Sequence, residues 1–285
     1  MSVICYYHKV DLDGKCSAAI VRRKYPDAEC IGVNYPDKPD FSQHPGKQVF
    51  IVDFCFEPED MYDLLVHHLG AVTWIDHHKS AIEKMSFSTY TDGVTSLIQA
   101  FDGKQEIGKA GCELTWEYLF PDEPTPDAVR LLGRYDVWDH SSDEVLPFQY
   151  GMRMEDWEPD KSYWQTLLND PNVYMDYLKD GDLLLKYENQ QNKVYANASV
   201  FPVEFEGHKA WAINKYFGNS KIFETLPDAQ RRPLWILFGL KNGAWKYSLY
   251  AAPDSGIDVS KIAVKYGGGG HVGAAGFKSN KYLLQ

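Results

Sequence analysis

The sequence predicts an α/β protein with an N-terminal parallel-sheet domain, a helical connector and a smaller α+β domain. Short apolar, β-branched runs alternate with amphipathic stretches over about the first 140 residues, as expected of parallel strands joined by helices. From Val200 onward, closely spaced strand pairs dominate instead. We therefore expect domains at 1–155 and 200–285, with residues 156–199 as the connector.

In the first domain, apolar runs predict four strands, and the amphipathic stretches predict five helices. The strands are expected at Val3–Tyr7, Cys30–Tyr35, Gln48–Phe54 and Ala71–Ile75. The helices are expected at Cys16–Lys24, Glu59–Leu69, Val94–Phe101, Gly111–Phe120 and Pro126–Trp138. Proline at an early position is typical of a helix start and supports the last of these. This rhythm predicts a parallel sheet covered by helices.

Turn composition over 141–160 precedes a helical stretch at 161–196, which we expect to break near Pro171 and Gly181. In the second domain, two hairpins are predicted, and Asn242-Gly243 suits the turn of the second one. Its strands and helix are expected at Val200–Phe205, Ala210–Ile213, Leu234–Leu240, Trp245–Ala251, Val259–Tyr266 (helix) and Ala275–Lys278.

Composition narrows the class of protein. The chain has 285 residues and a net charge of −11. Extensive non-specific binding to duplex nucleic acid is not expected, because it needs many lysine and arginine side chains to neutralise phosphates. Five cysteines without a C-x-x-C pair argue against a disulfide framework or a zinc knuckle. No basic leader with an apolar core and no stretch of about 18 apolar residues is present. We expect a soluble cytoplasmic protein.

Residues of metal-binding type follow three of the predicted strands and one predicted helix. Parallel strands present their carboxyl ends at one sheet edge, where ligands bind, so we expect these side chains to converge. A lone Asp or His at a strand end is usually a solvated loop residue or a cap, and only the joint occurrence favours a site. The candidates are His8, Asp11, Asp13, Asp53, Asp76, His77, His78 and Asp136.

Carboxylates gathered in this way repel one another unless protons or cations neutralise them. Two divalent ions would neutralise four of them. Oxygen ligands with some imidazole nitrogen favour Mn²⁺, with Mg²⁺ or Co²⁺ as alternatives. Paired metals of this kind suit the hydrolysis of phosphorus esters.

A run of four glycines, Gly267–Gly270, is followed by His271. Such a run can be a flexible hinge, or its backbone amides can close on a phosphate with His271 as a further donor. It is not a Walker loop, because no Gly-Lys-Ser/Thr follows at the required spacing. The two interpretations stay open on the residues alone.

These motifs, in this order, resemble the DHH/DHHA1 phosphoesterase superfamily. The resemblance covers nearly the whole chain, from the His-x-x-Asp-x-Asp-Gly segment at His8 to Gly-Gly-Gly-His-x-x-Ala-Ala-Gly at Gly268. The segment Arg134-Tyr135-Asp136-x-Trp138-Asp139 looks most like the nanoRNase B-type oligoribonuclease branch. Many members place three residues between the first His and Asp, whereas this chain has two.

The resemblance implies a role for each matching residue. His8 and Asp11 would bind one metal ion and Asp13, His77 and Asp136 the other, with Asp53 bridging both. Asp76 would orient His77, and His78 would contact the scissile phosphate. Asp53, Asp76, His77 and His78 are thus the expected catalytic residues. Substrate would also be held by Gly268, Gly269, Gly270 and His271.

The implied function is metal-dependent hydrolysis of short single-stranded oligoribonucleotides (nanoRNA) to mononucleotides. Alternatives are a cyclic mononucleotide or dinucleotide phosphodiesterase, and a pyrophosphatase-like hydrolase of phosphoanhydrides. A catalytically inactive nucleic-acid-binding scaffold is the least favoured interpretation, because a scaffold has no use for mutually repelling carboxylates. A homodimer is compatible with the pattern.

Overall fold

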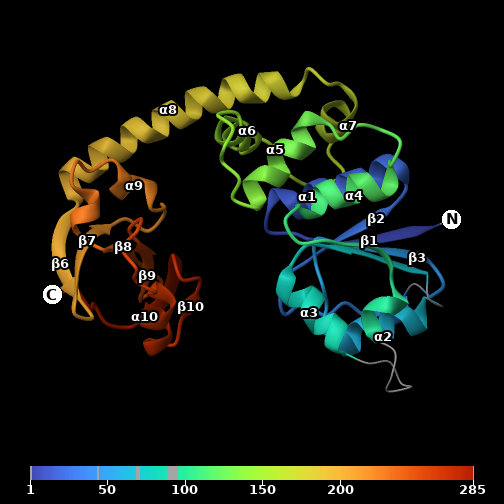
Figure 1. The fold of residues 1–285 in the computed structure, drawn as a ribbon, viewed down its shortest axis with the longest axis horizontal. Coiled ribbons are helices and arrows are strands. Elements are labelled where there is room, and N and C mark those ends of the chain that lie inside the picture. The colour runs from blue at the N-terminus through green and yellow to red at the C-terminus, as the bar shows by residue number, and fades with distance from the viewer. Residues whose placement is uncertain (1, 44, 69–70, 89–95, 285) are drawn as a thin grey trace. The chain divides into compact units, whose positions relative to one another are not determined.

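The computed structural model describes residues 2–43, 45–68, 71–88 and 96–284 (Figure 1). The chain forms two units, Met1–Leu184 and Leu185–Gln285, and the boundary falls within the long helix α8 (Tyr174–Ser199). The three-part division expected from the sequence stays a prediction. Within the described residues, no helix has both the length and the apolarity needed to cross a membrane.

The first unit is built on a five-stranded sheet in which every pairing is parallel, as predicted. Its strand order is β2-β1-β3-β4-β5. Because β2 and β3 lie on opposite sides of β1, the winding of the sheet reverses there, and this switch point is where open α/β sheets bind ligands. The strands are β1 (Val3–His8), β2 (Glu29–Val33), β3 (Gln48–Val52), β4 (Val72–Asp76) and β5 (Asp102–Gln105).

Helices cover both faces of this sheet (Figure 1). Alternate residues of β1 point to opposite faces: Cys5 and Tyr7 join one hydrophobic cluster, and Ile4 and Tyr6 join the other. The first cluster contains residues of α1 (Leu12–Lys24), α4 (Gly111–Leu119), α5 (Asp127–Asp136), α6 (Val145–Met152) and α7 (Ser162–Asn169). The second contains residues of α2 (Pro58–His67), α3 (Lys79–Phe87) and the 3₁₀ helices η1 (Phe41–Gln43) and η2 (Leu97–Ala100).

Four elements of this unit differ from the sequence expectation. Helices α3 and α6 and strand β5 were not expected. Helix α6 forms despite its Pro and Gly because Val145, Phe148 and Met152, spaced as on one helical face, are all buried in the core. The helix expected at Val94–Phe101 is a single 3₁₀ turn from Leu97 within the described residues, and its first two residues lie outside them.

The expected break near Pro171 is confirmed, because α7 ends at Asn169 and α8 begins at Tyr174. The break expected near Gly181 is wrong, since α8 continues through it. A Cβ at Gly181 would lie 1.7 Å from the Pro147 carbonyl oxygen. This glycine therefore permits the close approach of α8 to α6 and does not end a helix.

The second unit is a mixed six-stranded sheet of order β10-β11-β9-β8-β7-β6, with β7 and β8 parallel and the other neighbours antiparallel. Both predicted hairpins are present, and the second turns at Asn242 and Gly243, which both have positive φ. The strands are β6 (Phe201–Phe205), β7 (His208–Asn214), β8 (Leu234–Lys241), β9 (Ala244–Ala251), β10 (Gly269–Gly270) and β11 (Ala274–Ser279). The helices are α9 (Lys221–Glu224), η3 (Ala229–Arg231) and α10 (Val259–Lys265).

Candidate metal centre

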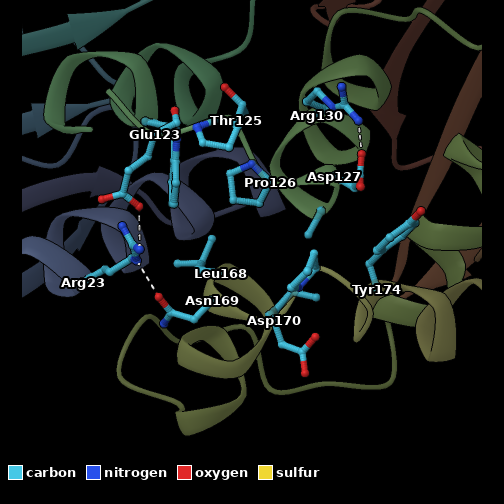
Figure 2. Close-up of a pocket in the computed structure, with 15 residues that line it drawn as sticks. Arg23, Glu123, Thr125, Pro126, Asp127, Arg130, Leu168, Asn169, Asp170 and Tyr174 are labelled. Atoms are coloured by element: carbon cyan, nitrogen blue, oxygen red, sulfur yellow. Dashed lines mark hydrogen bonds and ion pairs between the residues drawn. The ribbon is translucent and has the colours of Figure 1, made fainter. Parts of the chain in front are cut away.

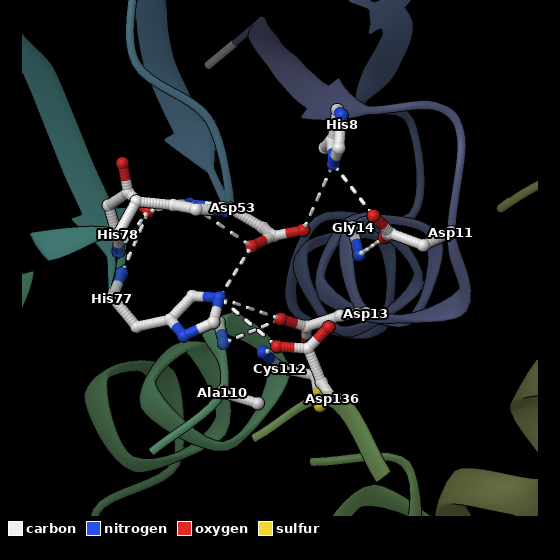
Figure 3. Close-up of polar contacts among 12 residues, drawn as sticks. His8, Asp11, Asp13, Gly14, Asp53, His77, His78, Ala110, Cys112 and Asp136 are labelled. Atoms are coloured by element: carbon white, nitrogen blue, oxygen red, sulfur yellow. Dashed lines mark hydrogen bonds and ion pairs between the residues drawn. The ribbon is translucent and has the colours of Figure 1, made fainter. Parts of the chain in front are cut away.

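Polar side chains converge at the carboxyl edge of the first unit's sheet (Figure 3). Strand β1 ends at His8, β3 ends just before Asp53, and β4 ends at Asp76. These three strands are adjacent and parallel, so their ends share one edge. The convergence follows from the topology.

The first group of possible metal ligands is His8, Asp11 and Asp53, whose ligand atoms lie within 4.8 Å of one another. Asp11 caps helix α1 and accepts a hydrogen bond from the Gly14 amide through Oδ1 at 3.0 Å. Its other oxygen, Oδ2, lies 2.8 Å from His8 Nδ1. The cap therefore fixes the carboxylate and leaves Oδ2 facing the site.

The second group is Asp13, His77 and Asp136. His77 Nε2 lies 3.5 Å from Asp13 Oδ2 and 3.3 Å from Asp136 Oδ2. Asp53 adjoins both groups, because its Oδ1 lies 3.1 Å from His77 Nε2 and its Oδ2 lies 3.7 Å from His8 Nδ1. The two oxygens of Asp53 thus face two neighbouring clusters.

Asp13 is held by the first turn of helix α4. Its two carboxylate oxygens accept hydrogen bonds from the Gly111 amide at 2.8 Å and the Cys112 amide at 2.7 Å. A Cβ at Gly111 would lie 2.7 Å from the Asp53 Cβ, so only glycine fits between the two carboxylates. Sequence reasoning missed Gly111, whose only signal was a glycine at a predicted helix start.

Asp53 has a left-handed backbone, with φ of 53°. This conformation is unfavourable for most residues, although Asp and Asn tolerate it best after glycine. The Asp53 amide donates to the Ile75 carbonyl at 2.9 Å, which ties the strained residue to β4. Strain of this kind tends to occur at functional sites.

Asp76 was expected to orient His77. In the structure, Asp76 Oδ1 lies 2.7 Å from Nδ1 of the neighbouring His78. The same oxygen accepts hydrogen bonds from the His77 amide at 2.8 Å and the His78 amide at 3.1 Å. The carboxylate thus fixes the backbone of both histidines and the ring of His78.

Comparisons with known proteins were made for the whole chain. No protein-family profile matches it. It is 26% identical over 245 residues to the uncharacterized protein R106 of Acanthamoeba polyphaga mimivirus, a match that covers 81% of this chain and 52% of that protein. The chain thus spans about half the length of this relative.

Two solved structures have the same architecture. The DHH domain of PF0399, named as a member of the s1p family of ribosomal proteins, aligns with a TM-score of 0.57 and 14% identity over 96% of this chain and 82% of that one. The pGpG-specific phosphodiesterase PggH from Vibrio cholerae aligns with a TM-score of 0.56 and 11% identity over 98% and 93%. This chain has the DHH-domain fold. The resemblance seen in the sequence is confirmed at the level of that fold.

The DHH-domain site carries an excess of negative charge, which shifts the pKa values of its groups. Burial and the nearby Asp53 raise the pKa of Asp13 to about 8. Burial and Asp13 raise that of Asp136 to about 7. Burial alone would lower the pKa of His77, but Asp53 and Asp13 outweigh it and raise the value to about 9. In the absence of metal, these groups therefore retain protons that a cation would displace.

A third possible ligand group, Asp53, His77 and His78, shares Asp53 with the first group and His77 with the second. The first two groups are oxygen-rich with one imidazole each, and such donors fit hard divalent cations. Asp53 and Asp13 are 1% and 3% exposed, so water cannot compensate their charge, and no lysine or arginine is paired with either carboxylate among the ion pairs of the described residues. The residues present fit a pair of metal ions.

The glycine-rich segment lies in the second unit, after α10. The Gly268 amide donates to the Ala263 carbonyl at 3.0 Å, and the His271 amide donates to the Ala274 carbonyl at 2.7 Å. A Cβ at Gly268 or Gly270 would lie within 2.6 Å of β11, whereas one at Gly269 would meet nothing within 4 Å. The amides of Gly268 and His271 thus already donate hydrogen bonds within the second unit, whereas the His271 side chain is exposed.

A cavity of about 430 Å³ lies elsewhere in the first unit (Figure 2). None of its lining residues belongs to the metal-binding groups. The guanidinium of Arg23 donates hydrogen bonds to Asn169 at 2.9 Å and to Glu123 at 2.8 Å (Figure 2). Its central carbon lies 4.7 Å from the centroid of the Trp116 ring. In this cavity Arg23 is thus paired with Glu123 and Asn169, and Arg130 is paired with Asp127.

Proposed function

We propose that this protein is a metal-dependent phosphodiesterase that hydrolyses short oligoribonucleotides to mononucleotides. The observation that carries the proposal is the placement of Asp53 between two clusters of metal-ligand type. His8, Asp11 and Asp53 would hold one ion, and Asp13, His77, Asp136 and Asp53 the other. The hard oxygen donors favour Mn²⁺, with Mg²⁺ and Co²⁺ as alternatives. Bound ions would lower the pKa of water and stabilise negative charge on the attacked phosphoryl group.

The chain's own residues would prepare the site for this reaction. The α1 cap orients Asp11, and the α4 amides orient Asp13, so both carboxylates are positioned before substrate arrives. His78 has Nδ1 tied to Asp76, and this hydrogen bond raises the pKa of His78. The ring would then donate from Nε2 to a phosphate oxygen, the role expected for it from the sequence.

One comparison supports a nucleotide substrate. PggH, which shares the fold, is named as specific for pGpG, a dinucleotide. The substrate-binding role of Gly268–His271 stays a prediction, as do a homodimer and a cytoplasmic location. Cyclic nucleotides and pyrophosphate remain the alternative substrates.

The test is hydrolysis in the presence of Mn²⁺ of a panel assayed side by side: 5′-labelled RNA of two to five nucleotides, a cyclic mononucleotide, a cyclic dinucleotide and pyrophosphate. We expect the short RNAs to turn over fastest, to mononucleotides, and we expect a chelator to stop the reaction. Faster turnover of pyrophosphate or a cyclic nucleotide would overturn the substrate assignment. No turnover across the panel would favour the scaffold.

A further inference from the structure

Trp138 combines two features that are unusual for a tryptophan. It is 83% exposed, and its backbone lies in the left-handed region with φ of 60°. For a bulky side chain this conformation is a genuine outlier. The residue directly follows the C-cap of α5, a position where glycine is the preferred residue.

The hydrogen bonds that shape the surrounding loop do not involve the Trp138 side chain. The Asp139 amide donates to the Arg134 carbonyl at 2.8 Å, closing the end of the helix. The Asp139 carboxylate accepts from Arg134 Nε at 2.9 Å and from the Ser141 hydroxyl at 2.7 Å. Glycine at position 138 would preserve all of these bonds without strain. The tryptophan therefore costs stability that its backbone role does not require, which points to a role for its ring.

The ring is not isolated. Its centroid lies 5.6 Å from that of His140, which in turn stacks on Tyr135 with centroids 5.5 Å apart. These contacts limit the directions that the indole can take, while most of its surface stays open to solvent. The result is a partly fixed, exposed aromatic surface.

Trp138 is close to the metal centre along the chain. Trp138 is two residues beyond Asp136, so their Cα atoms lie within about 7.6 Å of each other, and Asp136 Oδ2 lies 3.3 Å from His77 Nε2. Two further exposed apolar side chains accompany the ligand residues: Val10, 52% exposed, lies between His8 and Asp11, and Tyr35, 56% exposed, has its ring 4.5 Å from that of Phe54. Exposed apolar side chains near the candidate metal ligands suit a substrate that joins a planar base to a phosphodiester.

We propose that Trp138 is a stacking surface for one base of the nucleotide substrate; this inference rests on the proposed function. Stacking on an aromatic side chain tolerates any base, because every base has a π face. Trp138 would therefore strengthen binding of short oligonucleotides with little sequence preference. It would contribute nothing to pyrophosphate, which has no base.

The experiment compares three variants on two substrates with Mn²⁺ present. The variants are Trp138→Gly, which removes the ring and the strain, Trp138→Phe, which keeps a ring, and Phe87→Ala. Phe87 is 84% exposed at the end of α3 and is the matched control for loss of an exposed aromatic side chain. The substrates are an RNA dinucleotide and its abasic analogue, which has the same backbone without bases.

We expect Trp138→Gly to lower kcat/KM for the dinucleotide by about 5- to 150-fold, mainly through KM. We expect kcat/KM of Trp138→Phe to stay within about threefold of the wild type, and that of Phe87→Ala to match the wild type. The loss in Trp138→Gly should occur only with the substrate that carries bases. Unchanged kinetics in Trp138→Gly, or an equal loss on the abasic analogue, would overturn the inference, because the second result means that Trp138 acts by positioning Asp136.

Failure of the proposed function is separable from failure of this inference. Binding of a fluorescent RNA dinucleotide is measured by polarization with and without Trp138→Gly, independently of turnover. Binding by the wild type that weakens in the variant supports stacking even where hydrolysis is absent. A wild type that neither binds nor hydrolyses the dinucleotide overturns both proposals.

Discussion

The metal centre and the glycine-rich segment are the two places where the sequence predicts ligand binding, through metal ions in the first and through backbone amides in the second. They differ in whether their polar groups already have partners within the protein. In the metal centre, carboxylates from separate strands and helices lie together, and their mutual repulsion raises the pKa of Asp13, so that a proton offsets part of the charge when no metal is bound. In the glycine-rich segment, the amides of Gly268 and His271 already donate to carbonyls of their own unit. Buried carboxylates in contact are costly unless protons or cations neutralise them, whereas paired amides are stable alone. The first arrangement therefore favours a bound cation, and the second does not depend on a ligand.

The largest effect is expected from Asp53→Asn, which tests whether the shared carboxylate binds metal. Asparagine keeps the side-chain shape and tolerates the left-handed backbone, so the fold should be retained. Loss of a residue behind a metal ligand costs roughly 10- to 100-fold, and loss of a ligand shared by two ions should exceed about 100-fold in kcat/KM. Circular dichroism and the rate of Mn²⁺-dependent hydrolysis measure both effects.

The matching control is Asp60→Asn, a buried carboxylate of α2 that pairs with Lys38 and belongs to neither metal-binding group. Saturating Mn²⁺, at about 100 times its Kd, should raise the melting temperature of the wild type and of this control by about 5–10 °C. The rise should be much smaller in Asp53→Asn. An equal rise in both variants would show that Mn²⁺ binds elsewhere.

The second prediction concerns pH. The folded protein holds a proton on Asp13 up to about pH 8, whereas the unfolded chain loses it near the ordinary value of 3.8. His77 likewise keeps its proton up to about pH 9 when folded, against 6.5 when unfolded. Both differences make the unfolded chain release protons first, so raising the pH through this window favours unfolding.

The melting temperature of the metal-free protein should therefore fall by several degrees between pH 5 and pH 9. The stabilisation by Mn²⁺ should grow over the same range, because the ion competes with protons for the same ligands. Melting curves with chelator and with Mn²⁺ measure the two trends. A metal-free melting temperature that rises across this range would contradict the pKa shifts of Asp13 and His77.

Sequence patterns predicted the order of the first unit's main elements because each bears a clear hydrophobic period. Strand β5 escaped prediction because its sequence, Asp-Gly-Lys-Gln, has no apolar side chain. Its position is set by pairing with β4. Gly103 has φ of 129°, and only glycine fits there, because a Cβ would lie 1.9 Å from the Trp74 carbonyl oxygen. Helix α6 likewise depends on burial in the core, which overrides the helix-breaking residues within it.

For the site, the residue types at strand ends predicted which side chains would gather. The roles within the cluster needed coordinates, because the ring that Asp76 contacts depends on side-chain rotamers. Gly111 could not be found from its spacing, since its importance comes from Asp13 and Asp53, which are distant in the sequence and close only in the fold. Trp138 is visible in the sequence, but its exposure and its left-handed backbone are not.

A smaller effect on activity is expected in the glycine-rich segment. Substitutions at two neighbouring positions there distinguish a structural role from a role in substrate binding. Gly270 has φ of 145°, and a Cβ there would lie 2.5 Å from the Ala275 Cα, so Gly270→Ala should cost about 2–3 kcal/mol of unfolding free energy. Gly269→Ala meets nothing within 4 Å and should cost less than about 0.5 kcal/mol. Chemical denaturation of the full chain measures both costs.

The activity of the same pair shows what the segment does. If its open face contacts substrate, Gly269→Ala should raise KM although it leaves stability unchanged. Unchanged kinetics in Gly269→Ala would mean that the segment is purely structural. In that case the metal centre would bind ligands and the glycine-rich segment would only support the fold of its unit.

The smallest difference in stability between two paired variants is expected at Trp138, where the ring serves function and its backbone conformation costs stability. Trp138→Gly and Trp138→Ala both remove the ring, so they should impair dinucleotide hydrolysis equally. Only glycine is free of the left-handed penalty, so Trp138→Gly should be more stable than Trp138→Ala by about 1 kcal/mol, or about 2–4 °C in melting temperature. The control pair is Asp254→Gly and Asp254→Ala, because Asp254 has φ of 58° in the second unit. In the control pair, the glycine variant should again be the more stable one, and the kinetics should not change. Equal stability of the two Trp138 variants would mean that position 138 carries no backbone strain.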